Sequence, residues 1–222
     1  MKKIQIEIKL IIEFYDSFFF GGGIGTGEIQ SCLLRDINGF PYISGAALKG
    51  CIAEYAASLS RLVPAFNNGD KLFGIGGVQQ GSLYFENGNL VHMSKYNDIK
   101  ENLMELRTGV SINPYTKAKK EGQLYTMELS GMGGEMIFQS SICGFMDVDT
   151  YQKDISHIIA AVRMIFALGG RRSAGLGWLR SPIQCKVFKE IGVSGELKKE
   201  VIDSEYINQW IKDWIGGIAC TK

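Results

Sequence analysis

The residues best suited to chemistry lie between Gly169 and Gly177, which read Gly-Gly-Arg-Arg-Ser-Ala-Gly-Leu-Gly directly after a predicted helix. Glycine lets a backbone approach a ligand closely, and the planar guanidinium of arginine matches the oxygens of a phosphate. The pattern predicts a loop that holds a polyanion, and a helix-ending turn with two solvated arginines is the alternative. The candidate contacts are Gly170, Arg171, Arg172, Ser173 and Gly175.

Another candidate is Gly21–Gly27, which reads Gly-Gly-Gly-Ile-Gly-Thr-Gly and which we call the first glycine run because it comes first in the chain. Its spacing matches neither dinucleotide-binding nor P-loop motifs, and no helix follows it directly to receive a pyrophosphate. Unobstructed amides can still cradle phosphates. Gly21, Gly22 and Gly23 are therefore candidate contacts, and a mobile surface loop is the alternative.

A third candidate is Ser44–Gly50, a run of small residues at the start of a predicted helix. Lys49 lies in its first turns, where a cation opposes the helix dipole and an incoming phosphate would resolve the conflict. Gly45 and Lys49 are the candidate contacts. A solvated lysine on an exposed helix face is the alternative.

A basic loop, Tyr115–Lys120, contains three lysines beside one aromatic ring. Such a loop can follow a nucleic-acid backbone while the ring stacks on a base. Its candidate contacts are Tyr115, Lys117, Lys119 and Lys120. A solvated run of charges is the alternative.

Residues for acid–base or metal chemistry are sparse. His92 and His157 are the only histidines, and neither has an acidic or nucleophilic partner in sequence, so we expect both to be structural. The five cysteines form an odd, scattered set without a C-x-x-C pair, which argues against a disulfide framework and a zinc site.

The elements that must position these loops follow from hydrophobic periodicity. Residues 4–14 alternate as a strand does, and a helix is expected to begin after Ser44. Residues 82–90 predict another strand. Residues 124–146 predict two strands joined by a turn at 131–134. The first helix has its apolar face at Leu48, Ile52, Tyr55, Ala56, Leu59 and Leu62.

A second helix has its apolar face at Ile155, Ile158, Ile159, Val162, Ile165 and Phe166. A last strand at 178–188 and an amphipathic helix near 206–215 complete the chain. The order strand, helix, strand, strand, helix, strand predicts an α+β, ferredoxin-like fold with its helices on one face.

The composition sets the remaining limits. The chain has 222 residues, a formal net charge of +1 and no apolar run of the ~18 residues that a membrane span requires. Binding to a polyanion must therefore come from local clusters. We expect a single soluble, cytoplasmic domain with no membrane partner.

In combination these segments resemble the RAMP superfamily of CRISPR effector proteins, most closely the backbone subunit of type III complexes. Pro41–Gly50 (Pro-Tyr-Ile-Ser-Gly-Ala-Ala-Leu-Lys-Gly), Leu72-Phe73-Gly74 and Gly169–Gly177 match motifs that the family carries in this order. Also similar are Thr108–Pro114 and Glu121–Tyr125, which in the family flank a projecting thumb hairpin.

The resemblance implies one RAMP domain over residues 1–222, with an RRM-like core, an inserted thumb at about 108–125 and a C-terminal extension at about 190–222. It also implies binding of a guide (CRISPR) RNA and of complementary target RNA. The implied protein partners are other effector subunits, including copies of this chain or its paralogues.

The sequence departs from the family pattern at several positions. Ser44 replaces proline, and Ala46, Ala47 and Ala53 replace two serines and an arginine. Gln30 stands where active members carry the aspartate that cleaves target RNA, and an amide cannot act as a general base. Glu28 is the nearby substitute, and retained cleavage would imply Mg²⁺.

The resemblance leaves two alternatives to a guide-binding backbone subunit. A related guide-processing endoribonuclease shares the glycine-rich loop but usually relies on a histidine near the first helix, and none lies between Met1 and Leu90. A capping or assembly subunit would contact mainly protein and would have less need of the basic loop.

Overall fold

The computed structural model describes residues 2–23, 25, 29–112, 115–131, 136–193 and 196–216. Its centre is strand β1 (Lys3–Glu13), which pairs antiparallel with β8 (Ile137–Asp147) on one side and with β9 (Gln184–Val193) on the other. Strand β10 (Glu196–Ile202) extends the sheet beyond β9. The short strands β4 (Leu83–Phe85) and β5 (Asn89–Leu90) both pair with β8.

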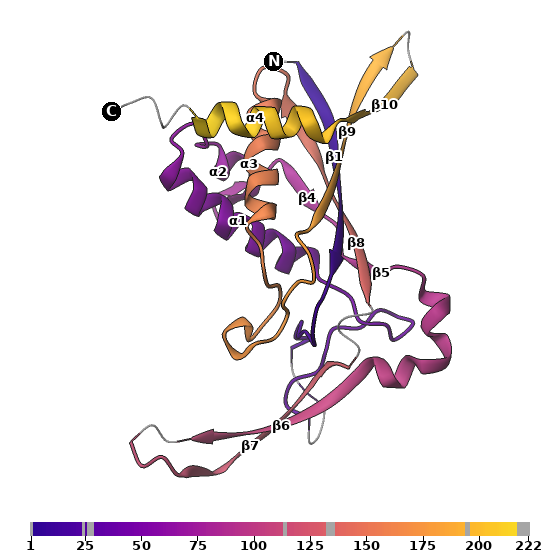
Figure 1. The fold of residues 1–222 in the computed structure, drawn as a ribbon, viewed down its shortest axis with the longest axis vertical. Helices are drawn as coiled ribbons and strands as arrows, with labels where there is room; N and C mark the ends of the chain where they lie inside the picture. Colours follow the sequence, from indigo (N-terminus) through magenta and orange to yellow (C-terminus); the bar gives the residue numbers. More distant parts are fainter. Residues whose placement is uncertain are drawn as a thin grey trace.

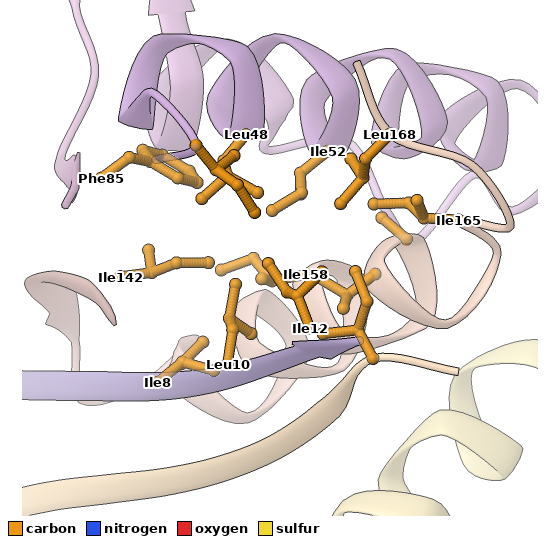
Figure 2. Close-up of a cluster of buried hydrophobic side chains, with 14 of the residues drawn as sticks. Ile8, Leu10, Ile12, Leu48, Ile52, Phe85, Ile142, Ile158, Ile165 and Leu168 are labelled. Carbon is orange, nitrogen blue, oxygen red and sulfur yellow. The ribbon is translucent and has the colours of Figure 1, made fainter. Parts of the chain in front are cut away.

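Alternation along β1 fixes which face of the sheet is buried. Ile6, Ile8, Leu10 and Ile12 are each at most 1% exposed, whereas the residues between them face outward. In Figure 2 the side chains of Ile8, Leu10 and Ile12 meet apolar residues from α1 and α3. Burial of β1 between two pairing strands and under two helices explains its clear sequence pattern.

Three helices cover the buried face of the sheet (Figure 1): α1 (Gly45–Leu62), α3 (Tyr151–Arg163) and α4 (Ser204–Gly216). Helix α1 begins where expected, because the Ser44 hydroxyl accepts a hydrogen bond from Ala47 N at 3.1 Å. Helix α4 packs against α3, with Ile207 buried and Trp210 against Tyr151.

The order of strands and helices confirms the predicted α+β, ferredoxin-like class. Along the chain β1, α1, β4, β8, α3 and β9 follow one another, and in the sheet β1 lies between β9 and β8. The structure adds elements that periodicity missed: the short helix α2 (Gly69–Phe73), the hairpin β2 (Gly74–Ile75) with β3 (Gln79–Gln80), and the 3-10 helix η1 (Met93–Leu103).

Residues 124–146 contain parts of two strands, as predicted, but the two strands do not pair with each other as a hairpin. Strand β7 (Lys119–Ser130) pairs with β6 (Met104–Ile112) in a separate two-stranded sheet, whereas β8 belongs to the main sheet. We call Met104–Ser130 the thumb hairpin. It projects from the body in Figure 1, and the insertion expected at 108–125 falls within it.

Three local expectations also needed correction. Leu62 ends α1 and is 67% exposed, because the apolar face of the helix runs out before its last turn. Phe166 lies beyond the end of α3 at Arg163 and is exposed rather than buried. The last core strand begins at Gln184, so Trp178 precedes it.

The C-terminal segment expected to extend the core contains the end of β9, then β10 and α4. Within the described ranges, no helix has both the length and the hydropathy to cross a membrane.

Candidate nucleic-acid interface

Three segments that are far apart in sequence meet at one pocket of about 360 Å³, which we call the glycine pocket. Gly21 comes from the first glycine run, and Ser44, Ala47 and Gly50 come from the start of α1. Gly169, Gly170 and Arg172 come from residues 169–177, which we call the GG loop. The structure therefore brings together parts of all three glycine-containing motifs.

Backbone hydrogen bonds hold the GG loop against the segment before the first glycine run. Gly170 N donates to Phe19 O at 2.8 Å, and Gly177 N donates to Ser17 O at 2.9 Å. The amide of Gly170 is therefore used within the protein, and what this residue offers a ligand is an exposed backbone without a side chain.

Two glycines of the GG loop are required by geometry. Gly169 has φ +100° and a Cβ there would lie 2.6 Å from Phe19 O; Gly177 has φ +76° and a Cβ would lie 1.9 Å from Leu168 O. Only glycine combines such a backbone with such close approach. Gly175, at φ +85°, ends the short helix η3 (Arg172–Ala174), and a Cβ there would meet no atom within 4 Å.

Arg171 reaches the middle of the thumb hairpin, where Tyr125 pairs with Gly109. Its guanidinium lies 4.7 Å from the ring centre of Tyr125, and Nη1 donates to the Tyr125 hydroxyl at 3.1 Å. Gly109 on the neighbouring strand makes room for that ring, since a Cβ there would lie 2.4 Å from it. Arg171 thus links the GG loop to the thumb hairpin, and it does so from a left-handed backbone with φ 57°.

Arg172 lies over α1. Nη2 is 3.3 Å from Glu54 Oε2, and Nη1 is 3.9 Å from Cys51 Sγ. Burial raises the pKa of Cys51 to about 11, so this thiol is protonated at neutral pH and is no nucleophile. Sequence reasoning missed Glu54, which partly neutralises Arg172 and is separated from it by 118 residues.

The other candidates from the first two motifs lie around the pocket. Gly22 N donates to Cys32 O at 2.8 Å, and Gly23, with φ +99°, has no atom within 4 Å of a would-be Cβ. Ser173 is exposed on η3.

Residues from the start of α1 face two different hollows. Gly45 N donates to Asn87 Oδ1 at 2.9 Å, and a Cβ at Gly45 would lie 2.2 Å from Phe85 O, so glycine is needed here for packing. Lys49 lines a different hollow of about 660 Å³, facing the β2–β3 hairpin, as does Ala53. Lys49 is therefore not brought beside Arg172.

The basic loop lies at the tip of the thumb hairpin, which projects from the body of the protein (Figure 1). Tyr115 is 93% exposed, and Lys117 has a left-handed backbone with φ 55°. Lys119 and Lys120 open strand β7, and their side chains lie outside the described part of the structure.

The catalytic candidate Glu28 lies outside the described residues. Gln30 is described, and its backbone N donates to Thr126 O of the thumb hairpin at 2.9 Å. Two carboxylates that sequence reasoning missed, Glu105 and Glu128, line a hollow beside Ile29. Both come from the thumb hairpin, and only the fold brings them to the first loop.

The carboxylates beside Gln30 already have cationic partners. Glu128 forms an ion pair with Arg35 and accepts a hydrogen bond from Leu33 N at 3.0 Å, and Glu105 pairs with Arg107 at 2.9 Å. Among the described residues, no three His, Cys, Asp or Glu side chains converge as a metal site. The described residues thus do not fit Mg²⁺, and we derive no step through it.

His157 is buried between α1 and α3, as a structural residue would be. It stacks on Phe66 with ring centres 4.7 Å apart, and Nε2 donates to Ala56 O at 2.8 Å. Burial lowers its pKa. His92 is exposed, in a left-handed backbone before η1, and neither histidine lines the glycine pocket.

Comparisons with known proteins agree with this architecture. Two cryo-EM structures of the type III-B Cmr-beta complex contain a chain of similar fold, one in the apo state (13% identity, TM-score 0.61) and one bound to cognate target RNA (14%, 0.62). Each match covers 81% of this chain and 96% of the other. No curated protein sequence matched.

A family model matches most of the sequence. The model of the RAMP superfamily matches residues 12–180, which runs from β1 through the thumb hairpin to the end of the GG loop. A match of this extent includes every element that forms the glycine pocket, and the chain therefore belongs to the RAMP superfamily.

Proposed function

We propose that this chain is a guide-RNA-binding subunit of a type III CRISPR effector complex. The observation that carries the proposal is the convergence of the first glycine run, the start of α1 and the GG loop on one pocket. Membership of the RAMP superfamily and the fold shared with a chain of the Cmr-beta complex support the same function.

The glycine pocket has properties that suit a sugar–phosphate backbone. Its walls include Gly21, Gly50 and Gly170, and at these three positions a strand can approach the protein main chain without meeting a side chain. Ser44 and Ala47 place the N-terminal end of the 18-residue helix α1 at the pocket, where the helix dipole favours an anion. Arg172 supplies a planar donor.

The shape and residues of the thumb hairpin suit contact with duplex or extended RNA. It projects away from the body and carries Lys117 and Tyr115 at its tip, and Arg171 contacts Tyr125 midway along it. In the proposed function the guide RNA lies in the glycine pocket, complementary target RNA pairs with it, and neighbouring effector subunits continue along the strand. Gln30 gives this chain no carboxylate at the cleaving position, so we assign it binding rather than cleavage.

Removal of the two arginines tests the proposal. Arg171→Ala with Arg172→Ala is expected to weaken binding of single-stranded RNA and to reduce the slope of log K against log salt by about one for each phosphate that is no longer neutralised. Fluorescence anisotropy titrations of labelled RNA at several salt concentrations measure both quantities.

Arg61→Ala is the matched control, because Arg61 is an exposed cation at the opposite end of α1. It should leave affinity and slope unchanged. Equal affinity and slope for wild type and the double variant, or purified protein that neither carries nor binds RNA, would contradict the proposed function.

A further inference from the structure

Two aromatic side chains are exposed beside the GG loop. Phe166 is 55% exposed and Trp178 is 46% exposed, with ring centres 5.3 Å apart and planes inclined by 43°. They line a second pocket of about 670 Å³, together with Glu54 and Tyr55 of α1 and residues of the GG loop. We call it the aromatic pocket.

The aromatic pair is held firmly at its backbone although its rings face solvent. Leu179 N donates to Phe166 O at 2.9 Å, and Ala167 forms an antiparallel bridge with Trp178. Neither Phe166 nor Trp178 packs into the main hydrophobic cluster, although their neighbours Ile165 and Leu179 do. Burial of such rings against a ligand would be favourable, and the backbone that carries them is already fixed by these hydrogen bonds.

The two pockets share a wall. Arg172 and Glu54 line both the glycine pocket and the aromatic pocket. A strand whose phosphate lies beside Arg172 in the glycine pocket therefore has its attached base within reach of the aromatic pocket. Arg171 and Arg172 also give the aromatic pocket positive groups that would remain beside the phosphates of an RNA strand.

We propose that the aromatic pocket binds one unstacked base of a single-stranded RNA, which stacks on Trp178 and Phe166. This inference rests on the proposed function and adds a base-binding subsite to it. Aromatic rings beside cationic groups are the combination that binds single-stranded nucleic acid, because every base has a π face. An apolar protein surface in the same place would have to bury the charge of Arg171, whose contacts with the Tyr125 ring and hydroxyl supply no opposite charge.

Tryptophan fluorescence reads this subsite directly. Trp210→Phe with Trp214→Phe leaves Trp178 as the sole tryptophan. Titration with a short RNA oligonucleotide should quench its emission, whereas an oligonucleotide of equal length and charge that lacks bases should bind through its phosphates with little quenching. The second ligand separates base stacking from a general effect of bound charge.

Affinity measurements on the otherwise native chain give an independent readout. Trp178→Ala and Phe166→Leu should each weaken RNA binding about tenfold while leaving the salt slope unchanged, because neither ring neutralises a phosphate. Trp178→Tyr, which keeps an aromatic face, should restore most of the affinity. Trp214→Ala on α4 is the matched control and should bind as wild type does, and circular dichroism melts verify that each variant is folded.

The outcomes distinguish this inference from the function on which it rests. One outcome would overturn the base-binding subsite and leave the proposed function intact. In it, wild type, Trp178→Ala and Phe166→Leu bind RNA with the same salt dependence, and RNA does not quench Trp178. The aromatic pair would then be a surface for a protein partner. Absence of RNA binding in all variants would overturn both.

Discussion

The pairing of Arg172 with Glu54 sets the charge of the interface. The two side chains are 3.3 Å apart and are 37% and 62% exposed, so their attraction contributes little to stability. The ion pair has a larger effect on the binding of a polyanion, because Glu54 offsets the positive charge of Arg172 and also repels phosphate. The chain as a whole has a net charge of only +1, so this local balance matters.

Glu54→Gln is therefore expected to strengthen RNA binding about two- to fivefold and to steepen the salt dependence by about one unit of slope. Anisotropy titrations from low to moderate salt measure both. Glu200→Gln is a matched control, since Glu200 forms a similarly exposed ion pair with Lys189 on β9 and β10. Equal responses of the two variants would show that the change acts through overall charge, contrary to this account.

At the scale of elements, the thumb hairpin is joined to the segment that follows the first glycine run. Glu128 N donates to Ser31 O at 2.9 Å, and the buried carboxylate of Glu128 binds Arg35 and Leu33 N. The residues around Gln30 and the base of the hairpin are thus joined by backbone and side-chain hydrogen bonds and an ion pair.

Glu128→Ala should release this junction. The free energy of unfolding is expected to fall by about 1–3 kcal/mol, because Leu33 N and Arg35 lose a buried acceptor. Urea unfolding measures the loss, and faster hydrogen exchange at Leu33 locates it. Glu105→Ala on the neighbouring strand removes an exposed ion pair with Arg107 and should cost no more than about 1 kcal/mol. A smaller loss for Glu128→Ala than for Glu105→Ala would be inconsistent with the junction.

Hydrophobic periodicity predicted the elements that have one clearly buried face. Ile6 to Ile12 revealed β1 because one of its faces is fully buried, and Ser44 marked the start of α1 because its hydroxyl caps the helix. Phe166 was misplaced because the helical spacing of α3 continues beyond its last hydrogen-bonded turn at Arg163.

The candidate site was only partly predictable. The glycines of the GG loop were visible because backbone geometry requires them at Gly169 and Gly177. The contacts of Arg172 with Glu54 and of Arg171 with Tyr125 join residues 118 and 46 positions apart. No local pattern encodes such contacts, because tertiary packing creates them.

At the scale of the whole molecule, His157 couples folding to pH. Its ring lies between Phe66 and the carbonyl of Ala56, where burial lowers its pKa below the value of about 6.5 expected in the unfolded chain. Well above pH 6.5 neither state is protonated at this residue, and its contribution to stability is complete. Below pH 6.5 the unfolded chain binds a proton that the folded chain resists, so this stability is lost as pH falls through the lowered pKa.

Urea unfolding at pH 7.5 and pH 5.5 should therefore reveal a larger loss of stability on acidification for the wild type than for His157→Gln, which lacks the titrating ring. His92→Gln removes the exposed histidine and should retain the behaviour of the wild type. A pH dependence that is the same in all three proteins would refute the role of His157.

The closure of the GG loop by its own flanking residues has a consequence for sequence variation. Leu168 N donates to Gly177 O and Leu179 N donates to Phe166 O, so the two ends of the loop are fastened to each other independently of the residues between them. Exchanges within 171–174, between Gly170 against Phe19 and the left-handed Gly175, should therefore leave folding almost untouched, and mutational scanning for fold and for RNA capture would diverge most sharply there. The residues tolerated at the apex of the GG loop should therefore be determined by RNA binding rather than by folding.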